Sequence, residues 1–257
     1  MAEDHIAVNI GGLRKIGLVE LAPLETGRFG VTSARALITD RKFAEQVLDF
    51  CEVENVKFLI ARCPVSVIVL PQFLERHGFQ LMDTLTYYSR DLSKPVLQTV
   101  ADTAAIKVHP ANGKENRVRQ IAVETFKNFD SHYSADPLLD KKKCDEVYVD
   151  WAYRSCLSRS ETSEVFIAEV DGQDGGFMAV RLNDSVEGEA FLMGVAPNFQ
   201  KRGVYRMMLI HGMNWCLSKG LKRMVESTQL HRLGPQKVWV RLGFEPSISL
   251  YTFHKWF

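Results

Sequence analysis

One segment of the chain is repeated at a fixed offset, and this repeat constrains the fold more than any other feature. An offset of 165 residues, which pairs Cys51 with Cys216, maps Arg41–Leu92 onto Arg206–Phe257 without a gap. In each copy an amphipathic helix runs into a short apolar strand, Val56–Ile60 in the first copy and Leu221–Val225 in the second. We therefore expect two related units of α/β class.

The end of each copy follows the same order of elements. A second helix ends in Arg-x-Gly-Phe, at Arg76–Phe79 and at Arg241–Phe244, where the glycine suits the left-handed position after a helix. A last strand follows in both. The polar stretch Asp91–Pro95 is the expected linker, because proline bars a helix there. The predicted domains are residues 1–95 and 96–257.

The second unit has additional elements at its front. Hydrophobic periodicity and turn residues predict the following strands and helices. In chain order they are a strand Ile106–His109, helices Glu115–Phe126 and Lys141–Ser155, a strand Val165–Val170, a hairpin over residues 171–176, strands Phe177–Leu182 and Ala190–Val195, and a helix Arg206–Ser218.

The charge balance excludes binding of an anionic partner through the net charge of the protein. The chain has 257 residues, 32 Lys+Arg against 31 Asp+Glu, and 46% hydrophobic residues, which is typical of a globular protein and not of a disordered or fibrous one. A net charge of +1 would not draw the chain to a nucleic acid polymer or an anionic membrane. An anionic ligand must therefore be held by a local cluster.

The five cysteines indicate neither a disulfide framework nor a zinc site, because they are odd in number and form no C-x-x-C pair. We expect no metal. The N-terminal residues show no basic and apolar regions of a signal peptide, and no apolar run approaches the ~18 residues of a membrane span. These features predict a soluble, cytoplasmic protein.

The segment Gln200–Tyr205 has the composition of an anion-binding loop. It lies between the strand Ala190–Val195 and a helix, whose free N–H groups and positive dipole end favour a phosphate. Lys201 and Arg202 add charge, and Gly203 permits close approach of the backbone. The first copy has Leu37 and Ile38 where the second has Arg202 and Gly203, so only the second unit is expected to bind the anion.

This succession of elements, with a Gln-x-x-Gly loop, resembles the Gcn5-related N-acetyltransferase (GNAT) superfamily over Ile106 to Phe257. More narrowly, the segments Gly78–Tyr87, Asp130–Leu139 and Ser227–Gln229 resemble the dTDP-fucosamine acetyltransferases and related sugar-nucleotide N-acyltransferases. The resemblance implies a GNAT fold, a mixed sheet flanked by helices and preceded by a smaller truncated GNAT-like unit.

The resemblance also implies an acetyl-CoA or other short acyl-CoA site. Its expected residues are Met193, Gly194, Val195, Gln200, Lys201, Arg202, Gly203, Val204, Tyr205, Arg206, Gln236 and Trp239. Two positions depart from the family pattern. Tyr205 replaces the last small residue of the loop, and Trp239 replaces the tyrosine that similar enzymes use as general acid. An indole is a poor proton donor to a thiolate.

The acceptor amine must lose a proton, and two side chains are candidates for this role. Glu189 enters the strand before the loop, and His132 lies in the polar segment Asp130–Asp136. Tyr205 is a substitute proton donor. Each has a structural alternative, since Glu189 can be a solvated strand end and His132 can close a turn. The residues expected to contact the acceptor are Asp130, His132, Tyr133, Asp136, Gln229 and His231.

The main prediction is an acyl-CoA-dependent N-acyltransferase acting on a nucleotide-linked amino sugar, with dTDP as the nucleotide, in O-antigen or other polysaccharide biosynthesis. The alternatives are transfer to another small amine or a protein N-terminus, and a non-catalytic CoA-binding regulatory module. A homodimer is a further expectation, because an exposed edge at Ser249–Phe253 could pair across two copies.

Overall fold

The computed structural model describes residues 8–10, 13–15, 17–95 and 106–257. The N-terminal stretch examined above for a signal peptide, and the residues just after the expected linker, therefore lie outside the described residues. The strands and helices of the first half are β1 (Val8–Ile10), β2 (Leu13–Lys15), β3 (Leu18–Leu21), α1 (Pro23–Phe29), β4 (Ser33–Leu37), α2 (Arg41–Val53), β5 (Phe58–Pro64), α3 (Val69–Arg76) and β6 (Gln80–Asp91). Those of the second half are β7 (Ile106–Pro110), α4 (Glu115–Phe126), α5 (His132–Ala135), α6 (Lys141–Leu157), β8 (Ser163–Val170), β9 (Gln173–Leu182), β10 (Glu187–Val195), a 3₁₀ helix (Pro197–Phe199), α7 (Val204–Ser218), β11 (Arg223–Gln229), α8 (Leu233–Arg241) and β12 (Glu245–Trp256).

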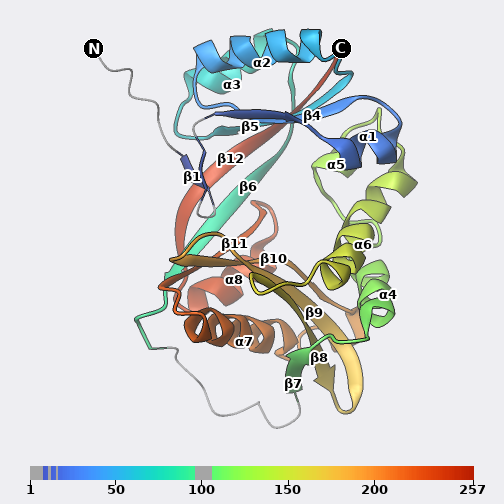
Figure 1. The fold of residues 1–257 in the computed structure, drawn as a ribbon, viewed down its shortest axis with the longest axis vertical. Coiled ribbons are helices and arrows are strands. Elements are labelled where there is room, and N and C mark those ends of the chain that lie inside the picture. Colours follow the sequence, from blue (N-terminus) through green and yellow to red (C-terminus); the bar gives the residue numbers. More distant parts are fainter. Residues whose placement is uncertain (1–7, 11–12, 16, 96–105) are drawn as a thin grey trace.

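Ten of the described strands form one mixed sheet that runs through both halves of the molecule (Figure 1). The strand order is β3-β4-β5-β12-β6-β11-β10-β9-β8-β7. The pairs β4-β5 and β10-β11 are parallel, and the others are antiparallel. The expected fold class, a mixed sheet flanked by helices with an additional smaller unit, is confirmed.

The sequence repeat is visible in the strand bounds. The offset of 165 residues carries β5 onto β11 and β6 onto β12, with the same first and last positions. Each copy gives its last strand to the other, because β12 lies between β5 and β6, and β6 lies between β12 and β11. Neither half therefore holds a complete sheet of its own. The division after Pro95 stays a prediction about sequence units.

The exchanged strands overturn one expectation. Ser249–Phe253 is part of β12, which pairs with β5 on one side and β6 on the other, so it has no edge to offer a second copy. The apolar character of this segment comes from its central place in the sheet, where Leu250 and Phe253 are buried.

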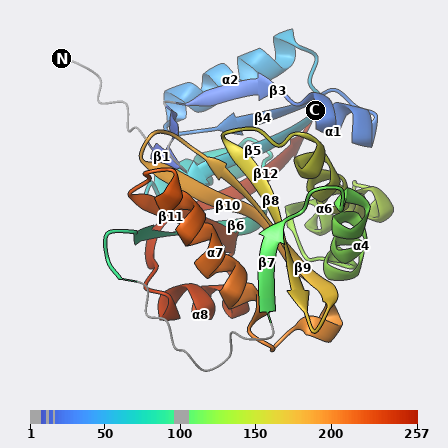
Figure 2. The ribbon, with the colours of Figure 1, turned by 60° about the horizontal axis from the view of Figure 1, so that its bottom comes forward.

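Helices cover the sheet in three groups (Figures 1 and 2). Helices α2 and α3 pack on the first-copy strands, and α7 and α8 pack at the opposite end of the molecule. Helices α4 and α6 cover β8, β9 and β10. Helix α6 also reaches α1 through an ion pair of 2.5 Å between Arg28 Nη2 and Asp150 Oδ2. The second half thus closes over part of the first.

The predicted elements agree with the structure in type and differ in their limits. The helix Glu115–Phe126 is confirmed at both ends, and both Gly78 and Gly243 have the predicted left-handed backbone, with φ of 78° and 82°. Strands β5 and β11 extend further toward their C-terminal ends than the predicted strands. The hairpin turns at Asp171–Gly172 alone, and the residues from Gln173 already belong to β9. No helix in the described part of the chain has the length and apolar character needed to cross a membrane.

Candidate active site

The anion-binding site predicted from the sequence, named here the cradle, comprises the loop Gln200–Gly203 and the first turn of α7. Lys201 and Gly203 both have positive φ, 60° and 82°, which folds the loop back against the start of the helix. A Cβ at Gly203 would meet only Ile106 Cδ1, at 4.0 Å, so the space beside this glycine is open to a ligand. The side chain of Gln200 is tied down, because its Nε2 donates to Val195 O at 3.0 Å.

The two copies differ in how the corresponding helix begins. In the first copy the side chain of Asp40 caps α2 and accepts a hydrogen bond of 2.8 Å from the N–H of Phe43. The equivalent residue of the second copy is Tyr205, and α7 has no side-chain cap. A helix start leaves several N–H groups without intrahelical partners. The first copy satisfies one of them with its own carboxylate, whereas no side chain caps the helix of the second.

Strands β10 and β11 separate beside this cradle. Their parallel pairing covers only Glu187–Glu189 and Arg223–Val225, after which β10 continues to Val195 along β9 and β11 continues to Gln229 along β6. A bulge between Ala190 and Leu192 marks the point of divergence. The strands open onto a cavity of about 1260 Å³ that is lined by both halves of the chain. The sheet is therefore splayed near Leu192–Val195.

Most of the predicted site residues line this one cavity. They are Asp130, His132, Tyr133, Glu189, Met193, Gly194, Val195, Gln200, Lys201, Gly203, Val204, Tyr205, Arg206, Gln229, His231 and Trp239. The fold thus brings the cradle, the candidate proton acceptors and the expected acceptor-binding residues to a shared space. Their individual roles stay predictions.

Three of the predicted residues lie outside the cavity lining. Arg202 is exposed and forms an ion pair with Asp171 at the hairpin turn. Gln236 accepts from the hydroxyl of Tyr88 at 3.3 Å and donates to backbone carbonyls at the start of α8. Asp136 is buried and accepts from His254 and Trp256. In each case at least one polar atom of the side chain is bound by another group of the protein.

A side chain at Gly194 would collide with a residue of the neighbouring strand. A Cβ at this position would lie 2.6 Å from Cε1 of Phe177, far inside van der Waals contact. The ring of Phe177 fills the space from the neighbouring strand β9, to which Gly194 is paired. The backbone of Gly194 nevertheless contributes to the cavity wall.

Trp239 and Tyr205 form a hydrogen-bonded pair beside the cradle. The indole Nε1 donates to the hydroxyl of Tyr205 at 3.1 Å, and the indole is fully buried. Burial, together with the nearby carboxyl of Glu226, raises the pKa of Tyr205 well above its usual value. The Tyr205 hydroxyl therefore stays protonated at neutral pH, and it has a bound donor to hold it in place.

Glu226 is a site residue that the sequence analysis missed. It lies on β11 beyond the end of the predicted strand, is 2% exposed, and its Oε1 has no hydrogen-bond partner. Burial raises the pKa of its carboxyl well above 4.5, and the charge of Glu189 adds to this effect. The available signal was a charged residue that continues the apolar run of a buried strand.

Glu189 differs from Glu226 in its environment. Its Oε2 accepts hydrogen bonds from Nη2 and Nε of Arg181, at 2.7 and 3.0 Å. Two carboxyl groups of one cavity thus differ in their surroundings, since Glu189 is paired with a cation and Glu226 is buried with an unpaired oxygen.

His132 begins a chain of buried hydrogen bonds. Its Nδ1 lies 2.9 Å from Nε2 of His254, and Nδ1 of His254 lies 2.7 Å from Oδ2 of Asp136. Because the Asp136 carboxylate needs a donor, His254 carries its proton on Nδ1 and accepts from His132 at Nε2. Burial, together with the nearby charges of Arg62 and Arg35, lowers the pKa of His132 well below 6.5. His132 is therefore neutral, with Nε2 as its proton acceptor.

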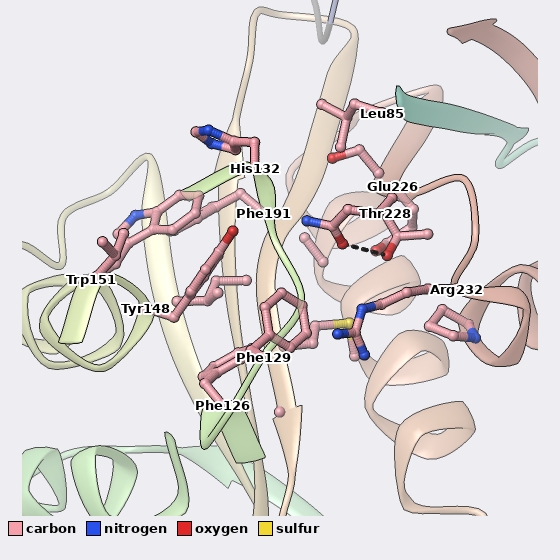
Figure 3. Close-up of a pocket in the computed structure, with 18 of the residues that line it drawn as sticks. Leu85, Phe126, Phe129, His132, Tyr148, Trp151, Phe191, Glu226, Thr228 and Arg232 are labelled. Carbon is pink, nitrogen blue, oxygen red and sulfur yellow. Dashed lines mark hydrogen bonds between the residues drawn. The ribbon is translucent and has the colours of Figure 1, made fainter. Parts of the chain in front are cut away.

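Aromatic side chains form one wall of the cavity (Figure 3). They come from α4, the segment after it, α6 and β10, and comprise Phe126, Phe129, Tyr148, Trp151 and Phe191. The rings of Trp151 and Phe191 are stacked with centroids 5.5 Å apart. The guanidinium of Arg232 lies 3.8 Å from the centroid of Phe129. This wall was not predicted, since its members are far apart in the sequence.

One group of described residues has the types and spacing of a metal site, and it lies outside the cavity. His109, Glu169 and Asp174 have ligand atoms within 4.8 Å of one another. The carboxylate of Asp174 is already bound by Lys114 Nζ at 2.9 and 3.0 Å. This cluster is therefore explained by ion pairing at the surface.

The model of the Acetyltransferase (GNAT) family matches residues 117–244, from α4 to the start of the last strand. Residues 117–244 belong to the GNAT family. The matched range contains the splay, the cradle and Glu226. This match agrees with the GNAT-type N-acyltransferase expected from the sequence.

Two solved structures similar to this chain support the fold. A GCN5-related N-acetyltransferase from Sphaerobacter thermophilus has a TM-score of 0.61 at 12% identity, covering 93% of this chain and 76% of the other. A tandem GNAT protein from the clavulanic acid biosynthesis pathway has a TM-score of 0.56 at 12% identity, covering 88% and 76%. Both agree with a GNAT fold that carries an additional unit.

A curated relative is more informative about the biological setting. The spore coat polysaccharide biosynthesis protein SpsD of Bacillus subtilis (strain 168) is 23% identical over 147 residues, which are 57% of this chain. The match spans about half, 49%, of that protein. The activity and substrate of the relative therefore do not transfer to this chain directly.

Proposed function

We propose that the protein transfers an acetyl or short (hydroxy)acyl group from acyl-CoA to the amine of a nucleotide-linked amino-deoxy sugar. The observation that carries this proposal is the uncapped start of α7, which opens onto the same cavity as Glu189, Glu226 and His132. The similarity to a polysaccharide biosynthesis protein and the resemblance to dTDP-fucosamine acetyltransferases support a sugar acceptor.

The residues of the cradle fit the phosphates of coenzyme A. The N–H groups at the start of α7 are available, the helix dipole favours an anion, and Lys201 and Arg206 line the cavity beside them. When bound, acyl-CoA supplies an activated thioester whose thiol, with a pKa near ~8.5, is a good leaving group. The open space beside Gly203 admits the ligand without displacement of a side chain.

Glu226, Glu189 and His132 have different roles in the proton transfers. We assign Glu226 as the proton donor toward the leaving thiolate, because its carboxyl is protonated and its Oε1 is unpaired. His132 accepts the amine proton at Nε2, directly or through water, while His254 and Asp136 hold its other nitrogen. Glu189, paired with Arg181, stabilises the resulting positive charge. Glu226 thus replaces the tyrosine that Trp239 has displaced.

The experiment is a titration of acetyl-CoA into the purified protein, followed by a thiol-release assay. The acceptors are dTDP- and UDP-linked amino sugars, and the donors are acetyl-, butyryl- and 3-hydroxybutyryl-CoA. Binding with release on one sugar supports the proposal and identifies its acyl group. Release on a polyamine or a peptide N-terminus alone would change the acceptor class. Binding without release on any amine would indicate the non-catalytic module.

We also propose that the protein is located in the cytoplasm. All five cysteines are buried and unpaired, as expected in a reducing compartment.

A further inference from the structure

Three polar residues lie side by side where the exchanged strands meet. Thr252 of β12 is in register with Arg62 of β5 on one side and with Asp83 of β6 on the other. Residues paired across neighbouring strands point to the same face of a sheet. Arg62 and Asp83 line the cavity. The three residues, named here the polar row, therefore lie together at its floor, where Thr252 is fully buried between the two residues that line the cavity.

The polar row contains an excess of unsatisfied hydrogen-bonding atoms. Among the described residues, eight buried side-chain polar atoms have no partner, and four of them are Arg62 Nε, Thr252 Oγ1, and Oδ1 and Oδ2 of Asp83. A buried polar atom without a partner costs about 1–3 kcal/mol, and more when it is charged. A fold that keeps four such atoms in one place indicates that a ligand satisfies them.

The charges of the polar row select the kind of group that can bind. A cation that approached Asp83 would also meet the guanidinium of Arg62, and an anion that approached Arg62 would meet the Asp83 carboxylate. A hydroxyl group suits both, because it donates to a carboxylate and accepts from an N–H. Asp83 offers two free oxygens, which matches a pair of neighbouring hydroxyls.

The aromatic wall provides the complementary surface. Arg62 and Asp83 both act electrostatically on Tyr148, which places its hydroxyl near the polar row. Tyr148, Trp151 and Phe191 line the same cavity, and Figure 3 shows these three rings gathered on one side of it. A ring with hydroxyls on its edge and C–H bonds on its face fits between such a wall and such a floor.

We propose that Arg62 and Asp83, with Thr252 buried between them, form a subsite for neighbouring hydroxyl groups of the acceptor's sugar ring. This inference rests on the proposed function, and it assigns sugar recognition to the first copy. The first copy has lost the cradle of a GNAT unit and supplies two of the three residues. Thr252 reaches them only because β12 inserts between β5 and β6.

The first test compares binding by Asp83→Asn with that by the wild type and by a surface control, Asp49→Asn on α2. Calorimetry with coenzyme A present uses a dTDP-linked 4-amino-4,6-dideoxyhexose, which has hydroxyls at C2 and C3, and its 3-deoxy analogue. We expect Asp83→Asn to raise the Kd for the sugar about tenfold, the effect of one lost hydrogen bond to a charged group. The Kd for acetyl-CoA should not change. With the 3-deoxy analogue, Asp83→Asn and the wild type should have the same Kd.

An unchanged sugar affinity in Asp83→Asn, or an equal loss with both sugars, would overturn the proposal. The melting temperature of the ligand-free protein gives a second reading. A binding role predicts that Asp83→Asn and Thr252→Val keep or raise it, whereas a structural role predicts a clear drop, and a drop overturns the subsite.

Failure of the proposed function is distinguishable from failure of the subsite. If the wild type binds no nucleotide sugar, the proposed function fails. Calorimetry with glucosamine then tests the subsite alone, because glucosamine has hydroxyls and an amine without a nucleotide. Glucosamine binding that weakens in Asp83→Asn while putrescine binding does not would retain the subsite. Absence of glucosamine binding would overturn it.

Discussion

Leu85 and Leu250 face each other across β6 and β12, and each occupies the position of the other in the repeat. The same offset relates the pairing of Leu85 with Gln229 to that of Leu250 with Pro64. An approximate two-fold axis therefore passes between these two leucines, and the two copies are joined by exchange of their last strands. The active-site cavity forms beside this junction, with walls from both copies.

The exchange predicts that the two halves unfold together. Leu250 is fully buried, so Leu250→Ala should lower the free energy of unfolding by about 3 kcal/mol. Urea denaturation followed by tryptophan fluorescence and by circular dichroism should give one coincident transition in both proteins. Leu217→Ala, at a side chain that is 44% exposed, is the control and should change stability by less than about 0.5 kcal/mol. Two separate transitions would contradict the continuous sheet.

Gly203→Glu should abolish acetyl-CoA binding, since it adds a side chain and a negative charge to the cradle. Gly220→Glu is a matched control at the other end of α7, because Gly220 has φ of 77° and open space around it, much as Gly203 has. Both variants should lose similar stability from backbone strain. Calorimetry should show a Kd raised about a hundredfold or more only in Gly203→Glu, the equivalent of about 2.7 kcal/mol. Equal affinity in the two variants would disprove the assigned cradle.

Glu226→Gln should separate stability from activity. The carboxyl is protonated in the folded protein and ionises near pH 4.5 in the unfolded chain, so the wild type binds more protons when folded. Its stability therefore falls as the pH rises above 4.5, by up to about 1.4 kcal/mol per pH unit. Thermal melts should show that the stability of Glu226→Gln relative to the wild type increases as the pH rises across this range. Its kcat for thiol release should drop about a hundredfold. The decline of kcat at alkaline pH that is expected for the wild type should be absent in the variant.

Full activity in Glu226→Gln would remove this residue from the proton transfer. A loss of stability in the variant at neutral pH would show that the wild-type carboxyl is ionised and paired.

His132 should make the protein sensitive to acid. Its pKa is lowered in the folded state, so below about pH 6.5 the unfolded chain binds a proton that the folded one does not. This contribution to stability is present above pH 6.5 and is lost progressively as the pH falls. Melting temperatures of the wild type should therefore decline between pH 7.5 and pH 5.5 more steeply than those of His132→Asn. Parallel curves would contradict a neutral, buried His132.

The elements with strong local signals could be predicted from the sequence. Helix α4 has the regular spacing of Val118, Ile121 and Ala122, and the repeat gave the order of elements in both copies. The cradle was predictable because Gly203, its basic neighbours and the helix are contiguous. These features depend on residues close together in the chain.

The exchange of the last strands between the two copies could not be predicted from the sequence. The cavity residues that this exchange brings together could not be predicted either. Which strand lies beside β5 depends on contacts between residues nearly two hundred positions apart, and a periodic pattern carries no information about that partner. His254 and Thr252 look like ordinary members of an alternating strand until β12 is placed under His132 and Arg62. Glu226 becomes chemically distinctive through its burial, for which the sequence offers only the indirect signal of a charged residue that continues an apolar run.

The most direct test of the central claim is mass spectrometry of the acceptor after incubation of the protein with acetyl-CoA and dTDP-linked amino sugars. We predict a product one acetyl group heavier, acylated on the sugar nitrogen, formed by the wild type and absent with Gly203→Glu. Acetyl-CoA that remains intact with every amine, although it binds the protein, would contradict the account.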